Sequence, residues 1–170
     1  MLTNAQNSRV VTLSSFGHKF AGVALDDPNF TTPPYDKWAA YGQSKTANSL
    51  FSVELERRGT ERGIGAFAVH PGRTLSTDLL CRMTDEEMKD FGVYRKNGII
   101  KVVAAYGIGV KSIEQGAATS VWCAVSSQLS GKGGVYYADC DIAELVSDDS
   151  QLQSGVRRWA IDKPTAKASE

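Results

Sequence analysis

Tyr41 and Lys45 are a pair of residues whose types and spacing could do chemistry. They stand four residues apart in a predicted helix, so both side chains project from one face, about a turn from each other. A free phenol has a pKa of about 10 and is a poor acid or base at neutral pH, but a nearby ammonium stabilises the phenolate and lowers that pKa. We therefore expect Tyr41 to exchange protons with a ligand.

Ser15 follows the short β-branched run RVVTL at residues 9–13, which predicts a buried strand that stops at a loop. Ligands of open α/β folds bind at the carboxyl edge of the strands, so the Ser15 hydroxyl could hold a substrate oxygen. A Tyr and a Lys at this spacing are weak evidence alone, because chance supplies about 0.4 such pairs per chain. The alternative is a structural phenol beside a solvated lysine.

The pattern around these residues indicates a parallel sheet. A helix is expected over about 37–58, where Ala47, Leu50, Phe51 and Leu55 share one face. A second strand is expected over 64–69, and it stops at His70-Pro71-Gly72. Strand, helix and strand in this order are the βαβ signature of a parallel sheet.

Two capping boxes predict further helices, one beginning at residues 84–87 and one at residues 112–115. A third strand is expected over residues 134–137, and residues 163–170 are expected to fray. The fold class is therefore α/β, a partial Rossmann-type, doubly wound parallel sheet of about three strands with crossover helices.

Composition excludes several classes of function. Nineteen basic residues balance nineteen acidic ones, so no long-range field would hold a nucleic acid, and the ligand should be small. Three cysteines at unrelated spacings predict free thiols, and two isolated imidazoles, His18 and His70, are interpreted as loop-packing residues. We expect no metal site, no membrane span and a cytoplasmic location.

The order of these features resembles the short-chain dehydrogenase/reductase family, from Arg9 to about Ala143. Within that family, VHPG and the ELERR-like helix end look most like the retinol-dehydrogenase-type branch. The segments that carry the resemblance are RVVTLSS at 9–15, YGQSK at 41–45 with Ala47-Asn48 after it, ELERR at 54–58, VHPG at 69–72 and GKGGVYYADCDI at 131–142.

The resemblance implies an oxidoreductase that uses NAD or NADP to interconvert an alcohol and a carbonyl by hydride transfer. Tyr41 would be the general acid/base, and Lys45 would tune Tyr41 and bind the nicotinamide ribose hydroxyls. Ser15, the second serine of its pair, would position the carbonyl. The choice between the two coenzymes and the identity of the substrate stay open.

The resemblance also assigns the turn after the second strand to the coenzyme. Pro71 and Gly72 would bring backbone against the nicotinamide, and a hydroxyl a few residues later would meet its carboxamide. Thr77 is the first candidate for that hydroxyl, with Thr74 and Ser76 as the others.

Residues 1–170 are expected to form a single domain, with residues 75–110 as a substrate-binding flap. The apolar side chains of that flap suggest a small apolar alcohol or carbonyl as substrate. They are Met83, Met88, Phe91 and Tyr94. The family further implies a homo-oligomer.

The family's glycine-rich turn, which seats the coenzyme pyrophosphate, should lie far upstream of Ser15. Only fourteen residues precede Ser15, and no GxxxGxG occurs in the sequence. We therefore expect the isolated chain to be inactive. The alternative to an oxidoreductase is a truncated, catalytically inactive remnant that acts at most through self-association.

Overall fold

The structure is a computed structural model that describes residues 5, 7–32, 34–74, 80, 83–102, 109–150, 152 and 154–168. Its contacts divide the chain into two compact units. The first is formed by residues 1–71 together with 118–170, and the second by residues 72–117. Ser15, Tyr41 and Lys45 all lie in the first unit.

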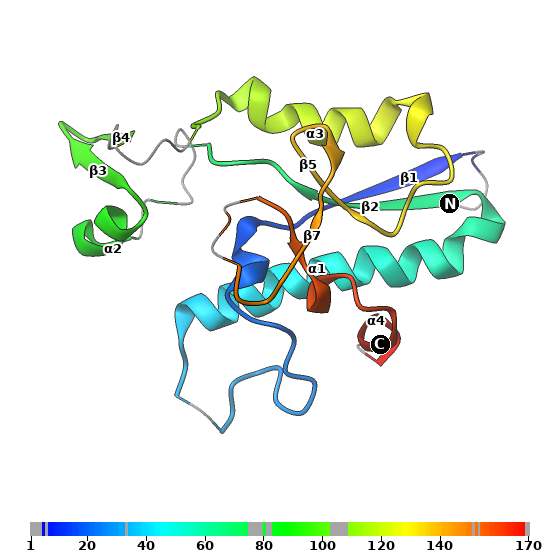
Figure 1. Ribbon diagram of the computed structural model, residues 1–170, viewed down its shortest axis with the longest axis horizontal. Coiled ribbons are helices and arrows are strands. Elements are labelled where there is room, and N and C mark those ends of the chain that lie inside the picture. The colour runs from blue at the N-terminus through cyan, green and yellow to red at the C-terminus, as the bar shows by residue number, and fades with distance from the viewer. Residues whose placement is uncertain are drawn as a thin grey trace. The chain divides into compact units, whose positions relative to one another are not determined.

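The first unit is built on a four-stranded sheet in the order β1-β2-β5-β6 (Figure 1). β1 (Ser8–Leu13), β2 (Ile64–His70) and β5 (Tyr136–Ala138) run parallel. β6 (Asp141–Ile142) follows β5 and pairs with it antiparallel. The three parallel strands confirm the expected α/β class, and the antiparallel fourth strand adds to it.

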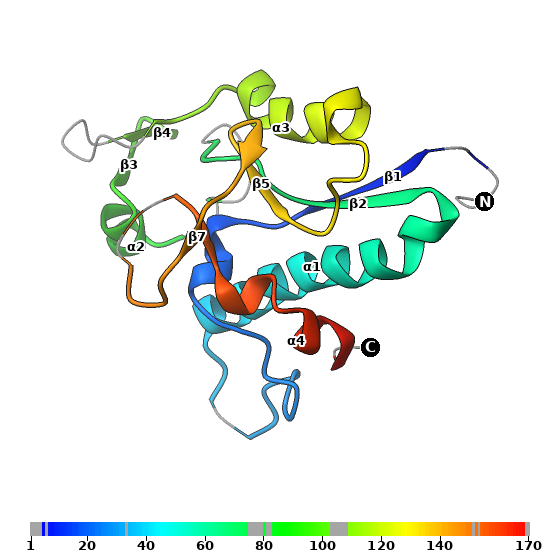
Figure 2. The ribbon, with the colours of Figure 1, turned by 45° about the vertical axis from the view of Figure 1, so that its right-hand side comes forward.

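The two crossover helices are α1 (Lys37–Gly59), between β1 and β2 in the chain, and α3 (Ile113–Val125), between β2 and β5. α1 and the part of α3 from Ala118 onward lie on opposite faces of the sheet (Figures 1 and 2). This is the doubly wound arrangement that βαβ connections produce.

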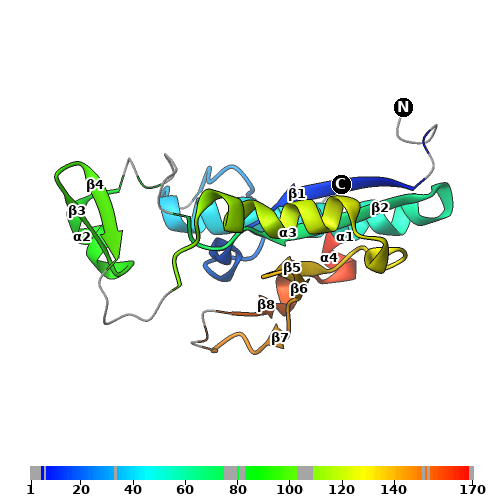
Figure 3. The ribbon, with the colours of Figure 1, turned by 90° about the horizontal axis from the view of Figure 1, so that it is seen from above.

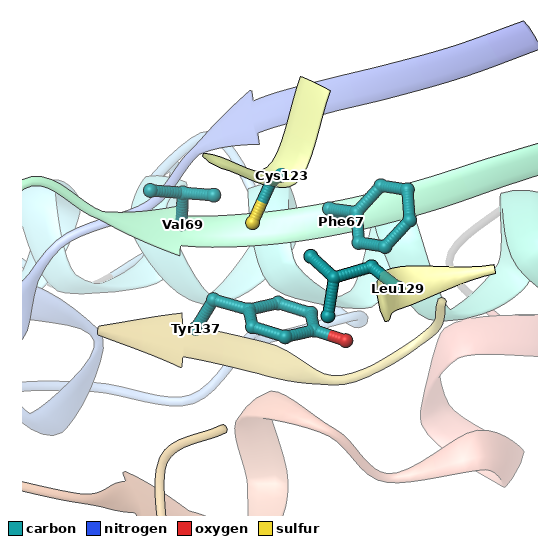
Figure 4. Close-up of a cluster of buried hydrophobic side chains, with 5 residues drawn as sticks. All are labelled: Phe67, Val69, Cys123, Leu129 and Tyr137. Carbon is teal, nitrogen blue, oxygen red and sulfur yellow. The ribbon is translucent and has the colours of Figure 1, made fainter. Parts of the chain in front are cut away.

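The core on the α3 side is a cluster of buried side chains from β2, α3, β5 and the short helix η6 (Ser127–Leu129) (Figure 4). Phe67 and Val69 alternate along β2 with Ala66 and Ala68, so only the odd-numbered residues point into this cluster. Tyr137 packs its ring 5.6 Å from the Phe67 ring. The cluster consists of Phe67, Val69, Cys123, Leu129 and Tyr137.

The buried face of α1 differs from the expected apolar stripe. Leu50 is fully buried, but Phe51 is 53% exposed. Small polar residues form part of the buried face instead. One of them, Thr46, is fully buried and donates a hydrogen bond to the Ala21 carbonyl at 2.7 Å. A Cβ on Gly42 would come within 2.7 Å of the Ala21 nitrogen. The expectation was wrong because α1 packs closely against the loop after β1, and that loop offers carbonyls to small hydroxyls.

The carboxyl end forms a helix, α4 (Lys163–Ala168), so the expectation of fraying was wrong for the described residues. Asp162 caps this helix by accepting hydrogen bonds from the nitrogen and hydroxyl of Thr165. Ala166 is 2% exposed and packs with Leu50 of α1. The cap at its start and the buried Ala166 both fix this short helix, and Ala166 fixes it against α1.

Short elements complete the first unit. β7 (Leu145–Val146) and β8 (Val156–Arg157) pair in parallel as a separate two-stranded sheet. The remaining elements are η2 (Phe16–Lys19), η3 (Thr60–Arg62), η6 (Ser127–Leu129) and η7 (Arg158–Ala160). None of the helices in the described part of the chain combines the length and apolar character that a membrane span requires.

The second unit contains α2 (Asp85–Asp90) and an antiparallel hairpin of β3 (Val93–Lys96) and β4 (Ile99–Val102) (Figure 3). The expected capping box at the start of α2 is present, with Thr84 and Glu87 bonded reciprocally. The hairpin was not predicted, although Asn97-Gly98 is a typical turn signal for one, and both residues have positive φ. That residues 75–110 act as a flap stays a prediction.

Candidate active site

Tyr41 and Lys45 lie one turn apart on α1, as their spacing predicts. The Lys45 Nζ lies 5.7 Å from the centroid of the Tyr41 ring. The same Nζ donates a hydrogen bond to the Leu13 carbonyl at 3.3 Å, and the Asn48 amide donates to that carbonyl at 3.0 Å. The end of β1 therefore holds the ammonium in place beside the phenol.

Ser15 lies in the turn that follows β1, and its hydroxyl caps η2 by accepting a hydrogen bond from the Gly17 nitrogen at 3.1 Å. Gly17 is buried against the Tyr41 ring, and a Cβ at this position would collide with Cε1 and Cδ1 of that ring. The turn that carries Ser15 therefore packs directly on the ring of Tyr41. In the first unit, the structure places the Ser15 turn, Tyr41 and Lys45 in one neighbourhood.

The two adjacent serines have different environments. Ser14 is 3% exposed, and its hydroxyl donates to the Lys45 carbonyl at 2.7 Å and accepts from the Ser49 hydroxyl at 2.9 Å. Its bonds fasten the end of β1 to α1. Ser15 is only partly buried, so it is the serine of the pair that a ligand could reach. That Ser15 positions the substrate stays a prediction.

A row of aromatic rings, which the sequence pattern did not predict, adjoins these residues. The Phe16 and Phe20 rings meet edge to face at 5.8 Å, and the Phe20 and Trp38 rings do so at 6.0 Å. Phe16 directly follows Ser15, and Trp38 precedes Tyr41 by one helical turn. Phe20 is 39% exposed. The row gives the neighbourhood of Ser15 and Tyr41 an accessible apolar surface.

Tyr136 is a second phenol close to this neighbourhood, but it is 2% exposed. Burial raises the pKa of Tyr136 well above its usual range, and the charge of an ionised Tyr41 would raise that pKa further. Tyr136 therefore stays neutral over the physiological range. It does not compete with Tyr41 as an acid or base.

The predicted nicotinamide residues are divided between the two units. Pro71 ends the first unit directly after β2. In the second unit, Gly72 has a φ of 83°, and a Cβ there would come within 2.6 Å of the Lys111 side chain. Thr74 forms an isolated β-bridge with Lys111. Ser76 and Thr77 lie outside the described residues, so the choice among the three hydroxyls stays a prediction.

His18 and His70 lie beside the Ser15 turn. His18 is fully buried, and that burial lowers its pKa to about 4, although the hydrogen bond to the Ser15 backbone opposes the change. His18 is therefore a neutral imidazole inside the fold.

Within the part of the chain that the structure describes, no group of three or more His, Cys, Asp or Glu side chains could hold a metal ion.

Comparisons with known proteins relate the chain to oxidoreductases. No family model matches it. It is 42% identical to a protein of Streptomyces lividans named "Probable oxidoreductase", over 97% of this chain and 54% of that protein. It is 36% identical to "Short-chain dehydrogenase/reductase prx1" of Penicillium rubens, over 91% of this chain and 42% of that protein.

A solved structure of an uncharacterized protein from Mycobacterium paratuberculosis has a similar fold. It superposes with a TM-score of 0.56 and 26% sequence identity, covering 95% of this chain and 47% of that one. The chain thus spans about half the length of the relatives it matches. It is homologous to these proteins, which are named as an oxidoreductase and a short-chain dehydrogenase/reductase. The retinol-dehydrogenase-type branch stays a prediction.

Proposed function

We propose that this chain carries the proton-transfer residues of an NAD- or NADP-dependent oxidoreductase that interconverts an alcohol and a carbonyl. The observation that supports the proposal most is the placement of the Lys45 ammonium 5.7 Å from the Tyr41 ring, on which the turn bearing Ser15 packs. The alternative, an inactive remnant, is not favoured by the names of the relatives. The proposal therefore expects turnover by this chain, in contrast to the inactivity expected from the missing glycine-rich turn.

Each residue of this set has a distinct role in the proposal. Tyr41 gives a proton to the carbonyl oxygen during reduction and takes it back during alcohol oxidation. Lys45 holds its positive charge beside the Tyr41 ring while the proton moves. Ser15 donates its hydroxyl proton to the same substrate oxygen and so fixes the distance to Tyr41.

The residues near Lys45 suit a nicotinamide coenzyme, because an ammonium fixed at the end of a parallel strand can bind ribose hydroxyls. Pro71 and Gly72 would approach the nicotinamide through their backbone, since the positive φ of Gly72 suits a residue without Cβ. One of Thr74, Ser76 and Thr77 would hold the carboxamide. The coenzyme, when bound, supplies the hydride chemistry.

The row of aromatic rings supports an apolar substrate. Phe16, Phe20 and Trp38 adjoin Ser15 and Tyr41 along the chain, and Phe20 is partly exposed. Rings of this kind bind an apolar body while the polar groups act on its oxygen. A small apolar alcohol or carbonyl therefore remains the proposed substrate class. A cytoplasmic location and a homo-oligomer remain expectations.

Replacing Tyr41 by Phe tests the proposal. The variant keeps the ring that packs on Gly17 but loses the exchangeable proton, so kcat/KM for a carbonyl panel with NADH or NADPH should fall at least about 100-fold. Tyr35→Phe is a matched control, because Tyr35 is 71% exposed. The activity of this variant should equal that of the wild type. Equal turnover by Tyr41→Phe and wild type would exclude Tyr41 as the acid/base.

A further inference from the structure

The peptide bond between Ser15 and Phe16 is held at both ends by imidazole rings. Its carbonyl, the Ser15 oxygen, lies 2.8 Å from Nδ1 of His18. Its N–H, on Phe16, donates a hydrogen bond to Nδ1 of His70 at 3.3 Å. His18 comes from η2 and His70 from the end of β2, so two separate elements grip one peptide plane.

The tautomer of His18 follows from its two partners. Nε2 lies 3.1 Å from the backbone N–H of Arg157, which can only donate, so Nε2 must accept. The Ser15 carbonyl can only accept, so Nδ1 must carry the proton. A neutral imidazole has one donor and one acceptor, and both are used here.

His18 is itself fixed from several sides. Its carbonyl accepts a hydrogen bond from the Trp159 indole of η7 at 2.9 Å. Its ring packs 4.8 Å from the Tyr136 ring of β5. Such an anchored ring can impose an orientation on the peptide to which it bonds.

We infer that His18 and His70 are positioning residues that orient Ser15 by clamping the peptide plane that follows it. The ψ angle of Ser15, 160°, is the rotation about the bond that joins its Cα to the carbonyl carbon of this plane. Clamping the plane therefore restricts the rotation of the Ser15 backbone. The hydrogen bond from the Gly17 nitrogen then fixes the hydroxyl. The inference rests on the proposed function, in which the Ser15 hydroxyl holds the substrate oxygen.

Asn and Leu variants at each position test the clamp. The amide of Asn can reproduce the hydrogen bond made at Nδ1, whereas Leu has similar bulk and no polar atom. At position 18 both variants lose the acceptor for the Arg157 N–H, so this loss cancels in the comparison between them. Thermal unfolding identifies any variant that fails to fold, in which case the pair at position 70 decides.

We expect kcat to be about tenfold lower in His18→Leu and His70→Leu than in the matching Asn variants. KM should change much less. Rescue by Asn separates positioning from mere filling of space. Equal kcat in the Leu and Asn variants would overturn the inference.

Two measurements do not depend on turnover. Nitrogen NMR of the wild-type chain should show that His18 is protonated at Nδ1 and unprotonated at Nε2. The opposite tautomer would overturn the inference. Hydrogen exchange at the Phe16 amide should be about tenfold faster in His70→Leu than in His70→Asn. If the wild-type chain shows no turnover, the proposed function fails, and these two measurements still decide whether the clamp exists.

Discussion

At the scale of single residues, the absence of a side chain at Gly17 sets how closely the Tyr41 ring approaches the Ser15 turn. No other residue type has room there, because a Cβ would overlap the ring. The Lys45 ammonium donates a hydrogen bond to the Leu13 carbonyl, and the Ser14 hydroxyl donates one to the Lys45 carbonyl. The positions of the side chains in the candidate site therefore depend on a few close contacts with the backbone.

Gly17→Ala should displace the Tyr41 ring and reduce both stability and activity. Overpacking of this kind costs about 1–3 kcal/mol, which urea unfolding can measure. Gly109→Ala is the control, since nothing lies within 4 Å of a Cβ at that position. A Gly17→Ala chain with the stability and kcat of the wild type would contradict the close packing described here.

His18 should make stability depend on pH. Burial lowers its pKa from 6.5 to about 4, so the unfolded chain takes up the proton at a higher pH than the folded chain does. The stabilisation is complete above about pH 6.5 and is lost as the pH falls towards 4, by up to about 3 kcal/mol. Urea unfolding between pH 7 and pH 4 measures this loss. His18→Leu should show a flatter dependence, and an equal slope in both chains would contradict the assignment.

At the scale of elements, α1 carries Tyr41 and Lys45 and packs on the turn that bears Ser15. Its first turns carry Tyr41 and Lys45, its small buried residues hold the loop after β1, and Leu50 meets α4. Contacts with β1, β2 and α4 fix the helix. Loss of α4 should therefore weaken the support of α1.

Ala166→Asp tests the contribution of α4. The substitution places a carboxylate at a position that is 2% exposed and packs with Leu50 and Val53, so the helix should detach and stability should fall by roughly 3 kcal/mol. Ala168→Asp, at an exposed position of the same helix, should change stability by less than about 0.5 kcal/mol. Equal effects of the two changes in urea unfolding would show that α4 does not pack on α1.

At the scale of the whole molecule, the chain spans about half the length of the relatives it matches. The coenzyme residues proposed here, Lys45, Pro71 and Gly72 among them, would all meet the nicotinamide end. None is assigned to the adenosine ribose, where the two coenzymes differ. The proposed contacts therefore do not discriminate between the two coenzymes.

Calorimetric titration with NADH and NADPH checks this prediction. The two coenzymes should bind this chain with affinities within about threefold of each other, because their nicotinamide ends are identical. Nicotinamide mononucleotide should compete with either of them. A preference above about tenfold for one coenzyme would show that residues of this chain reach the adenosine ribose.

Local patterns of the sequence determined the framework of this protein. Alternating and β-branched runs predicted three parallel strands, and reciprocal spacings predicted the capping boxes before α2 and α3, with Ser112 and Gln115 bonded as expected in the second. A four-residue spacing placed Tyr41 and Lys45 together on one helix face. These features depend on neighbours a few residues apart, which periodicity can detect.

Only the tertiary structure decided which long-range partners these elements acquire. It exposed Phe51, gave Thr46 and Ser49 buried hydrogen bonds, and packed α4 on α1. It also brought His18 and His70, distant in sequence, to the two ends of one peptide bond. Hydrophobic periodicity does not predict such contacts, because a buried polar residue is placed by a partner elsewhere in the chain rather than by its own apolar character.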